Sequence, residues 1–272
     1  MIRILRAGAS TRLVDGIGEP RRAHLGVSIG GAADRHSLAH ANSLVRNPLT
    51  AAALEMTLLG ATMGFEDPTQ FALSGAPFTA SLNDLPVAHH QAIDAQRGDI
   101  LRLQSSPTGI RAYCAIRGGL LLDIHRPLKA GDTLTSAHLP FVENHAAPPS
   151  IGDGHLRVTL GHAFTEPLLQ GQFTVSPSSN RQAIFLDGPK GEFGIAAPAG
   201  HMITEGVPLG AIQLPPSGQP MILFIDQQTT GGYPVIATVI YRDIPKLGQL
   251  RPQQPVHFTY VTFEEAQKLN RS

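Results

Sequence analysis

Residues 221–240 read MILFIDQQTTGGYPVIATVI. The apolar runs at 221–225 and 235–240 predict two buried strands, since short apolar runs bounded by turn residues are typical of strands in a protein core. The nine residues between the runs place several polar side chains ahead of a Gly-Gly pair, among them Asp226, Gln228, Thr229 and Thr230. We expect a hairpin with a polar tip, whose glycines let the backbone approach a ligand or another strand closely.

The composition of the whole chain agrees with a strand-rich protein. The 272 residues include 28 Gly and 22 Pro, and only 15% are charged, a mixture that suits short strands joined by tight turns better than long helices. Apolar segments of strand length recur in both halves of the chain, at 53–59, 71–73, 100–103, 111–116, 156–160, 173–175, 183–186 and 256–261. These features predict a mainly β fold with a few short helices.

Two helices stand out from this pattern. Apolar residues recur at helical spacing over 34–47, and the Asn-Pro pair at 47–48 supplies a stop. Near the end of the chain, Thr262 is followed three residues later by Glu265. This spacing lets each side chain bond the other residue's free amide in a capping box, so a short terminal helix is expected.

The length of the chain indicates two domains. It exceeds the ~100–200 residues that one domain usually contains. The strand and helix patterns weaken between about 120 and 150, and the Ala-Ala-Pro-Pro-Ser run at 146–150 is poor in residues that favour either element. The sequence therefore predicts an N-terminal strand-rich domain at 1–150 and a C-terminal one at 151–272.

Charge and cysteine content exclude several classes of protein. Lys plus Arg and Asp plus Glu number 21 each, so no global field draws the chain to nucleic acid or to an anionic membrane. The single cysteine, Cys114, excludes an internal disulfide framework and fits a reducing compartment. No apolar run reaches the ~18–20 residues of a membrane span, and residues 1–6 lack the apolar stretch of a signal peptide. We expect a cytoplasmic protein that binds neither nucleic acid nor membrane.

Several ordered blocks resemble one protein family. Residues 210–237 match a pattern of Gly-x-Ile/Val-Gln-x-Pro-x-x-Gly-Gln-Pro, a strand, and then Asp-x-Gln-Thr-Thr-Gly-Gly-Tyr-Pro-x-Ile-Ala. The family's N-terminal blocks occur in the same order at 24–27, 31–34, 41–45, 53–57, 71–76 and 111–119. The chain thus resembles the carboxyltransferase-type family that includes the C subunit of 5-oxoprolinase, allophanate hydrolase subunit 2 and the carboxyltransferase part of urea amidolyase.

This chain departs from the family in two polar blocks. Residues 120–129 read LLLDIHRPLK, where family members have Ile-Asp-Val-Pro followed by a Gly-Ser-Arg-Ser-Thr block. Residues 179–186 read SNRQAIFL in place of the family's Ser-Asn-Arg-Met-Gly-Tyr-Arg-Leu. Positions suited to binding an anion or an amide are therefore apolar or missing, and the chain reads as a divergent, shortened member.

The resemblance implies a fold, a reaction and partners. The fold would be two β-barrel domains of the cyclophilin-like type, and the activity an ATP-dependent hydrolysis of 5-oxo-L-proline to L-glutamate. The A-type and B-type subunits would complete the hetero-oligomer, with ATP at a site shared with these partners. No bound metal or biotin is expected on this chain, because the Met-Lys-Met biotin-carrier motif is absent and His36 and His40 have no indicated third ligand.

The resemblance and the residue chemistry together select candidate site residues. Arg181 beside Asn180 offers a forked donor to a carboxylate, and Gln213 and Gln228 suit an amide. Asp226 would orient a water or a phosphorylated intermediate. The predicted catalytic residues are Asp226, Gln228, Thr229 and Thr230. The predicted substrate-binding residues are Asn180, Arg181, Gln213, Gly231, Gly232, Tyr233 and His24.

Three alternatives remain open. The polar side chains of the hairpin can instead satisfy their own backbone, a structural role that such residues often have. A second enzymatic hypothesis is the carboxyltransferase component of a biotin-dependent enzyme, with biotin supplied on a partner. A third is a non-catalytic regulator, because some relatives antagonise a sporulation-kinase inhibitor by binding the homologue of the B-type subunit.

Overall fold

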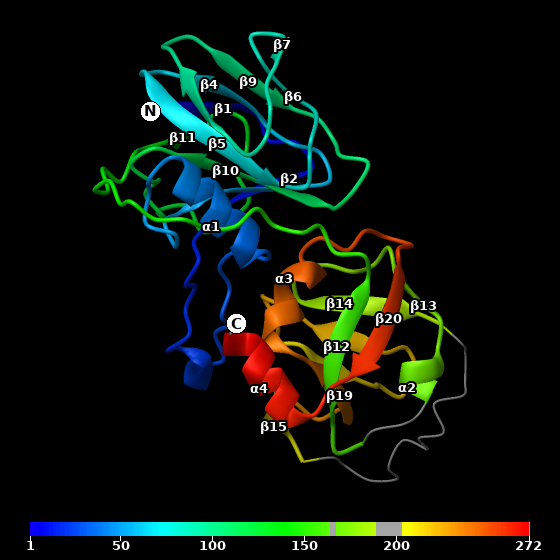
Figure 1. Cartoon of the computed structure of the whole chain (residues 1–272). Coiled ribbons are helices and arrows are strands. Elements are labelled where there is room, and N and C mark those ends of the chain that lie inside the picture. The colour runs from blue at the N-terminus through cyan, green and yellow to red at the C-terminus, as the bar shows by residue number, and fades with distance from the viewer. Residues whose placement is uncertain (164–166, 189–202, 272) are drawn as a thin grey trace. The chain divides into compact units, whose positions relative to one another are not determined.

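The chain folds into two units (Figure 1). The computed structural model describes residues 1–163, 167–188 and 203–271. Unit 1 comprises residues 1–18 and 34–151, and unit 2 comprises residues 19–33 together with the chain from 152 onward. The sequence did not indicate that 19–33 joins the later unit. It does so because this segment hydrogen bonds within unit 2, where the Gly30 amide donates to the Ile225 carbonyl at 2.9 Å.

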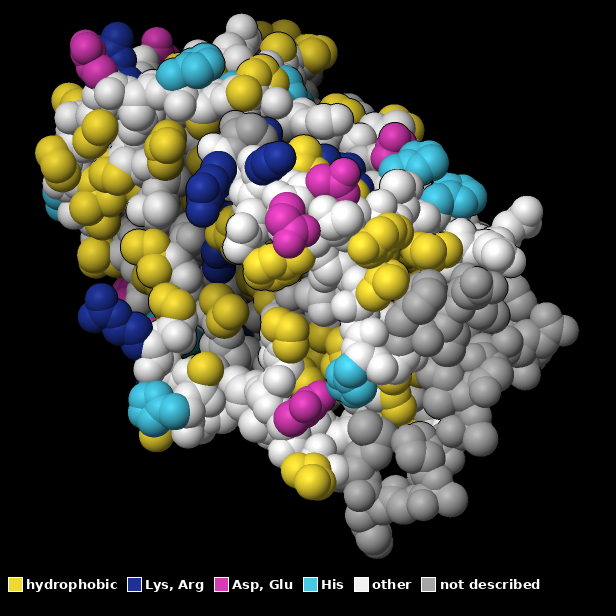
Figure 2. Space-filling model, turned by 60° about the horizontal axis from the view of Figure 1, so that its bottom comes forward, with side chains coloured by type: hydrophobic (Ala, Val, Ile, Leu, Met, Phe, Trp, Pro, Cys, Tyr) yellow, Lys and Arg dark blue, Asp and Glu magenta, His cyan; other side chains and the backbone are white. Residues whose placement is uncertain are grey.

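Charged groups are spread over the surface. On the face drawn in Figure 2, Lys and Arg side chains lie interspersed with Asp and Glu, in keeping with 21 residues of each sign. Among the described residues, no helix combines the length and the apolar character needed to cross a bilayer.

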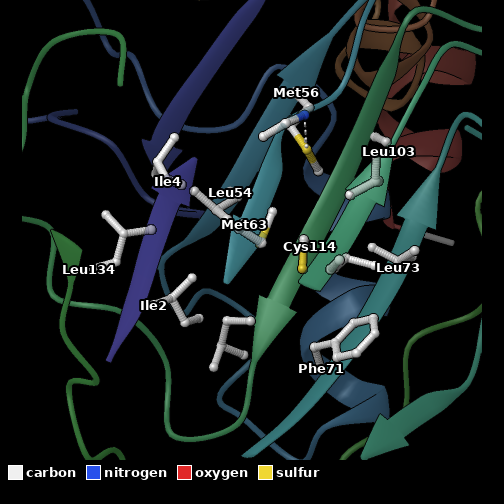
Figure 3. Close-up of a cluster of buried hydrophobic side chains, with 14 of the residues drawn as sticks. Ile2, Ile4, Leu54, Met56, Met63, Phe71, Leu73, Leu103, Cys114 and Leu134 are labelled. Atoms are coloured by element: carbon white, nitrogen blue, oxygen red, sulfur yellow. Dashed lines mark hydrogen bonds between the residues drawn. The ribbon is translucent and has the colours of Figure 1, made fainter. Parts of the chain in front are cut away.

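Unit 1 is built from two antiparallel sheets around one core. The first sheet has the order β11 (Thr133–Leu134), β1 (Ile2–Arg6), β4 (Thr62–Phe65), β9 (Ile100–Leu103), β6 (Ala80–Leu82) and β7 (Leu85–Pro86). The second has the order β2 (Ser10–Val14), β3 (Ala53–Thr57), β10 (Arg111–Ile116), β5 (Thr69–Gly75) and β8 (Ala92–Ala95). Figure 3 shows one buried cluster to which both sheets contribute, with Ile4 and Met63 from the first and Leu54 and Cys114 from the second.

Helix α1 (Arg35–Leu44) covers the outer face of the second sheet against β10 and β5. All six residues of β10 are buried, because the core lies on one face of this strand and α1 on the other. The helix begins where expected, with the Asp34 side chain accepting from the Ser37 amide at 3.0 Å. Tyr113 holds this end by accepting from the Asp34 amide and donating to Glu55, each at 2.7 Å. The helix ends at Leu44, before the predicted Asn-Pro stop, because Arg46 adopts a left-handed conformation with φ 57°.

Unit 2 is a closed barrel. Its strands follow the order β12 (His155–Leu160), β19 (Val235–Val239), β16 (Ala211–Gln213), β17 (Met221–Leu223), β14 (Ala183–Asp187), β13 (Phe173–Val175) and β20 (Pro255–Tyr260). β12 and β20 pair in parallel and the other neighbours are antiparallel. A separate two-stranded sheet joins β15 (Glu205–Gly206) to β18 (Thr230–Gly231). The predicted mainly β fold is therefore confirmed.

Short helices complete unit 2. They are η1 (Ala23–Leu25), α2 (Pro167–Gln170), η2 (Tyr241–Asp243), α3 (Ile244–Leu247) and α4 (Phe263–Arg271). The capping box predicted for α4 is present. The Thr262 amide donates to Glu265 Oε2 at 2.8 Å, and the Glu265 amide donates to Thr262 Oγ1 at 3.2 Å.

The hairpin predicted at 221–240 is wrong. β17 and β19 do not pair with each other, because β16 lies between them: Ile212 is in register with Ile222 on one side and with Ala237 on the other. The polar segment 226–234 therefore passes from one neighbour of β16 to the other, and its middle residues, Thr230 and Gly231, pair with β15 instead of closing a tight turn.

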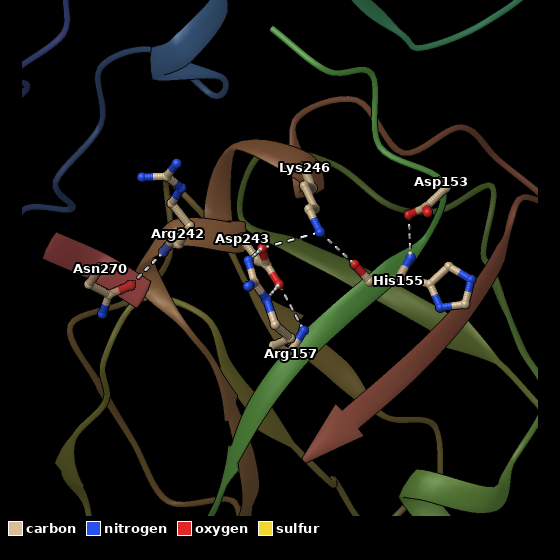
Figure 4. A network of polar contacts seen from close by, with 7 residues as sticks. All are labelled: Asp153, His155, Arg157, Arg242, Asp243, Lys246 and Asn270. Atoms are coloured by element: carbon tan, nitrogen blue, oxygen red, sulfur yellow. Dashed lines mark hydrogen bonds and ion pairs between the residues drawn. The ribbon is translucent and has the colours of Figure 1, made fainter. Parts of the chain in front are cut away.

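A polar network braces the barrel beside η2 and α3 (Figure 4). The Asp243 carboxylate accepts from the Arg157 backbone amide at 2.8 Å and from the Arg157 guanidinium at 2.6 and 2.9 Å. The Lys246 ammonium lies 3.2 Å from the same carboxylate and donates to the His155 carbonyl at 3.0 Å. The fully buried Asp243 thus connects strand β12 to the helical turn after β19.

Candidate functional site

The first residue of the polar segment, Asp226, is held by Arg181. The guanidinium donates from Nε to Asp226 Oδ2 at 2.8 Å and from Nη2 to Oδ1 at 3.0 Å. The Asp226 amide also donates to the Arg181 carbonyl at 2.8 Å. Arg181 further donates to the Gly31 carbonyl at 2.8 Å. The structure therefore brings together two residues predicted to act separately on a substrate, and it binds them to each other and to the segment 19–33.

Two glutamine amides meet at Gly231. Gln213 on β16 is fully buried, and its Nε2 lies 3.4 Å from the Tyr233 carbonyl oxygen. A Cβ placed on Gly231 would lie 2.9 Å from Gln213 Nε2 and 3.4 Å from Gln228 Nε2. A larger residue at this position would have to displace the end of the Gln213 side chain, so Gly231 lets the backbone lie against the ends of both glutamine side chains.

The side-chain oxygen of Gln213 is an acceptor without a hydrogen bond in the described structure. This buried Oε1 has no hydrogen-bond partner among the described residues. Leaving a buried carbonyl-type oxygen unpaired costs about 1–3 kcal/mol, which a fold tolerates where the atom has a functional role or a bound group supplies the donor. Gln228, in contrast, is exposed. One amide of the pair therefore lies in the protein and the other faces solvent.

Gln227 is a site residue that the sequence analysis missed. It is buried, and its Nε2 donates to the Val207 carbonyl at 3.1 Å while its Oε1 lacks a partner in the described part of the chain. The Val207 amide donates to the Thr229 carbonyl at 3.1 Å. These bonds hold the polar segment against residues 205–207, far away in the sequence. No local pattern signals this, because the glutamine's partner is a backbone carbonyl.

The other predicted residues divide between the segment and remote positions. Thr230 is exposed in β18, Gly232 is partly buried, and Tyr233 is 43% exposed. The Asn180 side chain accepts from the amides of Gln182 and Ala183 at 2.7 and 3.3 Å. Asn180 therefore bonds its own turn, a structural role that asparagine side chains often have.

His24 lies apart from this arrangement. It belongs to η1 and is exposed, and none of the contacts found among the described residues joins it to the other predicted site residues. Glu205 is a further carboxylate that the sequence analysis did not consider. It is exposed and lies in register with Gly231 across the β15–β18 pair.

Side chains that could bind a metal ion do not gather at one point in the described residues. Within the described ranges, no group of three or more His, Cys, Asp or Glu side chains is placed to hold a metal ion. His36 is exposed and His40 is buried, with the His40 ring 5.2 Å from that of His90, so the two predicted helix histidines do not share an open face. Arg181 is engaged by Asp226 and Gly31.

The chain is thus a mainly β protein with a closed barrel, in which the polar segment 226–234 joins β17 to β19. The chain belongs to the family described as carboxyltransferase domain, subdomain A and B, whose model matches residues 25–139 and 124–260. It is 32% identical to the C subunit of 5-oxoprolinase from Haemophilus influenzae, covering 90% of this chain and 87% of that protein. It is also 32% identical to the C subunit of 5-oxoprolinase from Escherichia coli, covering 98% and 94%.

A solved structure extends the similarity to a longer enzyme. The crystal structure of the K. lactis urea amidolyase matches 99% of this chain with a TM-score of 0.89 and 30% sequence identity. The chain spans 19% of that protein. The similarity therefore concerns one part of a much longer polypeptide.

Proposed function

We propose that this chain is the C-type component of an ATP-dependent amide hydrolase resembling 5-oxoprolinase, which converts 5-oxo-L-proline to L-glutamate together with A-type and B-type partner subunits. The observation that carries the proposal is the meeting of the Gln213 and Gln228 amides at Gly231. The relation to the C subunits of two bacterial 5-oxoprolinases along nearly the whole chain supports it.

A glutamine amide is chemically complementary to a lactam. The cyclic amide of 5-oxoproline presents its N–H and C=O on one edge, and a glutamine side chain offers an acceptor oxygen and a donor nitrogen in the same arrangement. Because Gln228 is exposed, we assign it to contact the lactam. Gln213 is a positioning residue that lies beneath Gly231 and supports the segment.

The chemistry of the reaction requires activation of the amide. An amide carbonyl is a weak electrophile. Transfer of the terminal phosphoryl group of ATP to the amide oxygen releases ADP and makes the carbon more electrophilic. Water then adds to this carbon, the ring C–N bond breaks, and inorganic phosphate leaves as glutamate forms. We place ATP at a site shared with the partner subunits. We assign the exposed Thr230 hydroxyl and the partly buried Thr229 to hydrogen bond the substrate's carboxylate or the charge that develops during the reaction. Asp226 is assigned to hold the start of the polar segment through its ion pair with Arg181.

The test is reconstitution with the candidate A-type and B-type partners, ATP and 5-oxoproline, with glutamate and ADP measured together. Gln228→Met should lower turnover at least tenfold while the complex still forms. Gln267→Met is the matched control, because Gln267 is an exposed glutamine on α4 in the same unit. Equal turnover by the two variants would refute the role of Gln228, and a complex without any glutamate formation would indicate the non-catalytic regulator instead.

A second function is favoured by the match of almost the whole chain to the urea amidolyase structure. In that case the chain would be the carboxyltransferase component of a biotin-dependent enzyme, with biotin carried by a partner. The discriminating measurement supplies a biotinylated partner, ATP, bicarbonate and urea. Formation of carboxylated urea without glutamate formation from 5-oxoproline would select this function over the hydrolase.

A further inference from the structure

Unit 1 contains a pocket that the proposed function does not use. It is open to solvent, has a volume of about 420 Å³, and lies beside the loop that follows β10. Apolar side chains form much of its wall, among them Ile116, Leu134, Leu139 and Phe141. The volume is within the range of small-molecule sites, which are mostly apolar with a few polar groups that fix the ligand.

Arg117 brings a cation to this apolar pocket. Its guanidinium carbon lies 4.7 Å from the centroid of the Phe141 ring, a stacking distance that orients the planar group. Its Nε is buried and has no hydrogen-bond partner in the part of the chain that the structure describes. No acidic side chain among the described residues forms an ion pair with Arg117, so its positive charge is uncompensated beside apolar walls.

A buried asparagine holds Arg117 in place. Asn47 is fully buried; its Nδ2 donates to the Ile116 carbonyl and its Oδ1 accepts from the Gly118 amide, both at 2.8 Å. The Arg117 amide donates to the Gln70 carbonyl at 2.9 Å. The peptide groups on both sides of Arg117 are thus bonded to one side chain. Gly118, with φ 83°, adopts the left-handed conformation that this loop requires.

The remaining charges at the pocket leave an excess of positive charge. Asp67 is its one acidic lining residue in the described chain, and this carboxylate is bound by the Met1 ammonium at 2.8 Å and by Arg97 at 3.0 Å. His138 and Ser136 also line the pocket. Asp67 is therefore already paired with two cations, whereas none of the ion pairs among the described residues includes Arg117.

We propose that this pocket binds a small monocarboxylate with an apolar body. The carboxylate pairs with the Arg117 guanidinium, whose fork of N–H donors matches its two oxygens. The apolar body fills the space against Ile116, Leu134 and Leu139. A dianion such as phosphate fits less well, because the apolar side chains that form much of the wall offer it no hydrogen bonds. This site is in unit 1 and is independent of the polar segment 226–234 of unit 2.

Isothermal titration with 4-methylpentanoate tests the proposal on the full chain carrying only a C-terminal tag, which leaves the contact between Met1 and Asp67 undisturbed. The neutral analogue 4-methylpentanamide, acetate and inorganic phosphate are titrated beside it. We expect binding of 4-methylpentanoate and at least tenfold weaker binding of each of the other three. Equal affinity for the amide would refute the role of charge, and tighter binding of acetate or phosphate would refute the apolar subsite.

Variants assign the site to Arg117. Arg117→Met should raise the dissociation constant at least tenfold, whereas Arg102→Met should leave it unchanged, since Arg102 pairs with Asp84 on the surface of the same unit. Phe141→Ala removes the exposed ring that stacks on Arg117 and lines the pocket, and it should weaken binding about threefold. Each variant's thermal unfolding is checked first. If Arg117→Met does not fold, Arg117→Lys and Phe141→Ala decide, and unchanged affinity in the folded variants overturns the proposal.

Discussion

The Arg181 guanidinium donates hydrogen bonds to both carboxylate oxygens of Asp226, at 2.8 and 3.0 Å, although the two residues are 45 positions apart in the sequence. The side chains of Arg181 and Asp226 are 14% and 30% exposed. Bidentate pairs of this kind are stronger than single hydrogen bonds because two charge-assisted contacts share one geometry. The pair ties the beginning of the polar segment to the loop before β14, and through Gly31 to the segment 19–33.

A double-mutant cycle should measure this coupling. We expect Asp226→Asn and Arg181→Met each to lower the free energy of unfolding by about 1–3 kcal/mol, because each leaves the other group without its partner. The double variant should cost less than the sum of the two, with a coupling energy of about 1–2 kcal/mol. Urea unfolding at pH 7 provides the values. Additive costs would show that the two side chains do not depend on each other.

Gly231→Ala should destabilise the polar segment 226–234. The added Cβ would lie 2.9 Å from Gln213 Nε2, so the Gln213 amide must move away from the Tyr233 carbonyl that it contacts, and a loss of about 1 kcal/mol in stability is expected. Gly206→Ala is the matched control, because Gly206 lies opposite Thr230 in the paired strand and a Cβ there meets nothing within 4 Å. Thermal unfolding of both variants makes the comparison. Equal losses would contradict the close packing at Gly231.

The Asp243 network should make stability depend on acidic pH. Burial alone would raise the pKa of Asp243, but the hydrogen bonds from Arg157 and the charges of Lys246 and Arg157 outweigh burial and hold the pKa below its ordinary value of 3.8. A lowered pKa means that the stabilisation is present above pH 4 and is lost as the pH falls through the folded-state pKa. Asp243→Asn should therefore cost about 3 kcal/mol at pH 7 and progressively less below pH 4.

Urea unfolding at pH 7, 5 and 3 checks this dependence. The exposed carboxylate of Asp187, which accepts from Gln219 at 2.9 Å, supplies the control variant Asp187→Asn. This control should cost less than about 0.5 kcal/mol. A cost for Asp243→Asn that does not change between pH 7 and pH 3 would contradict the assigned ion pair.

Cys114 should be chemically inert in the folded protein. It lies in the core of unit 1, and burial raises the pKa of its thiol to about 12. Only the thiolate reacts with disulfide reagents, so at pH 8 we expect no reaction within an hour in native buffer and complete reaction in denaturant. The release of thionitrobenzoate from Ellman's reagent gives the rate. Fast labelling in native buffer would show that the β10 strand opens readily.

The capping box of α4 can be tested by removing its hydroxyl. Thr262→Ala deletes the group that accepts from the Glu265 amide at 3.2 Å, and loss of an N-cap hydroxyl costs about 1 kcal/mol. Thr262→Ser keeps the hydroxyl and should retain most of the stability. Chemical unfolding distinguishes the two variants, and identical stabilities would show that the helix does not depend on this cap.

The features that the sequence alone determined are local ones. Thr262 and Glu265 are three residues apart, so their reciprocal bonds follow from helix geometry and could be predicted. Apolar runs such as 173–175 and 111–116 became strands because hydrophobic period and turn residues act within a few positions of the chain. The same ordered motifs indicated the family to which the chain belongs.

Tertiary structure alone decided how distant segments combine. No local pattern shows that β16 separates β17 from β19, that residues 19–33 belong to unit 2, or that Arg181 is bound by Asp226 rather than free for a ligand. Strand order and long-range ion pairs depend on which apolar faces bury each other across the whole chain. Local propensity contributes little to that choice, because many pairings satisfy the same local pattern and the packing of the complete core selects one of them.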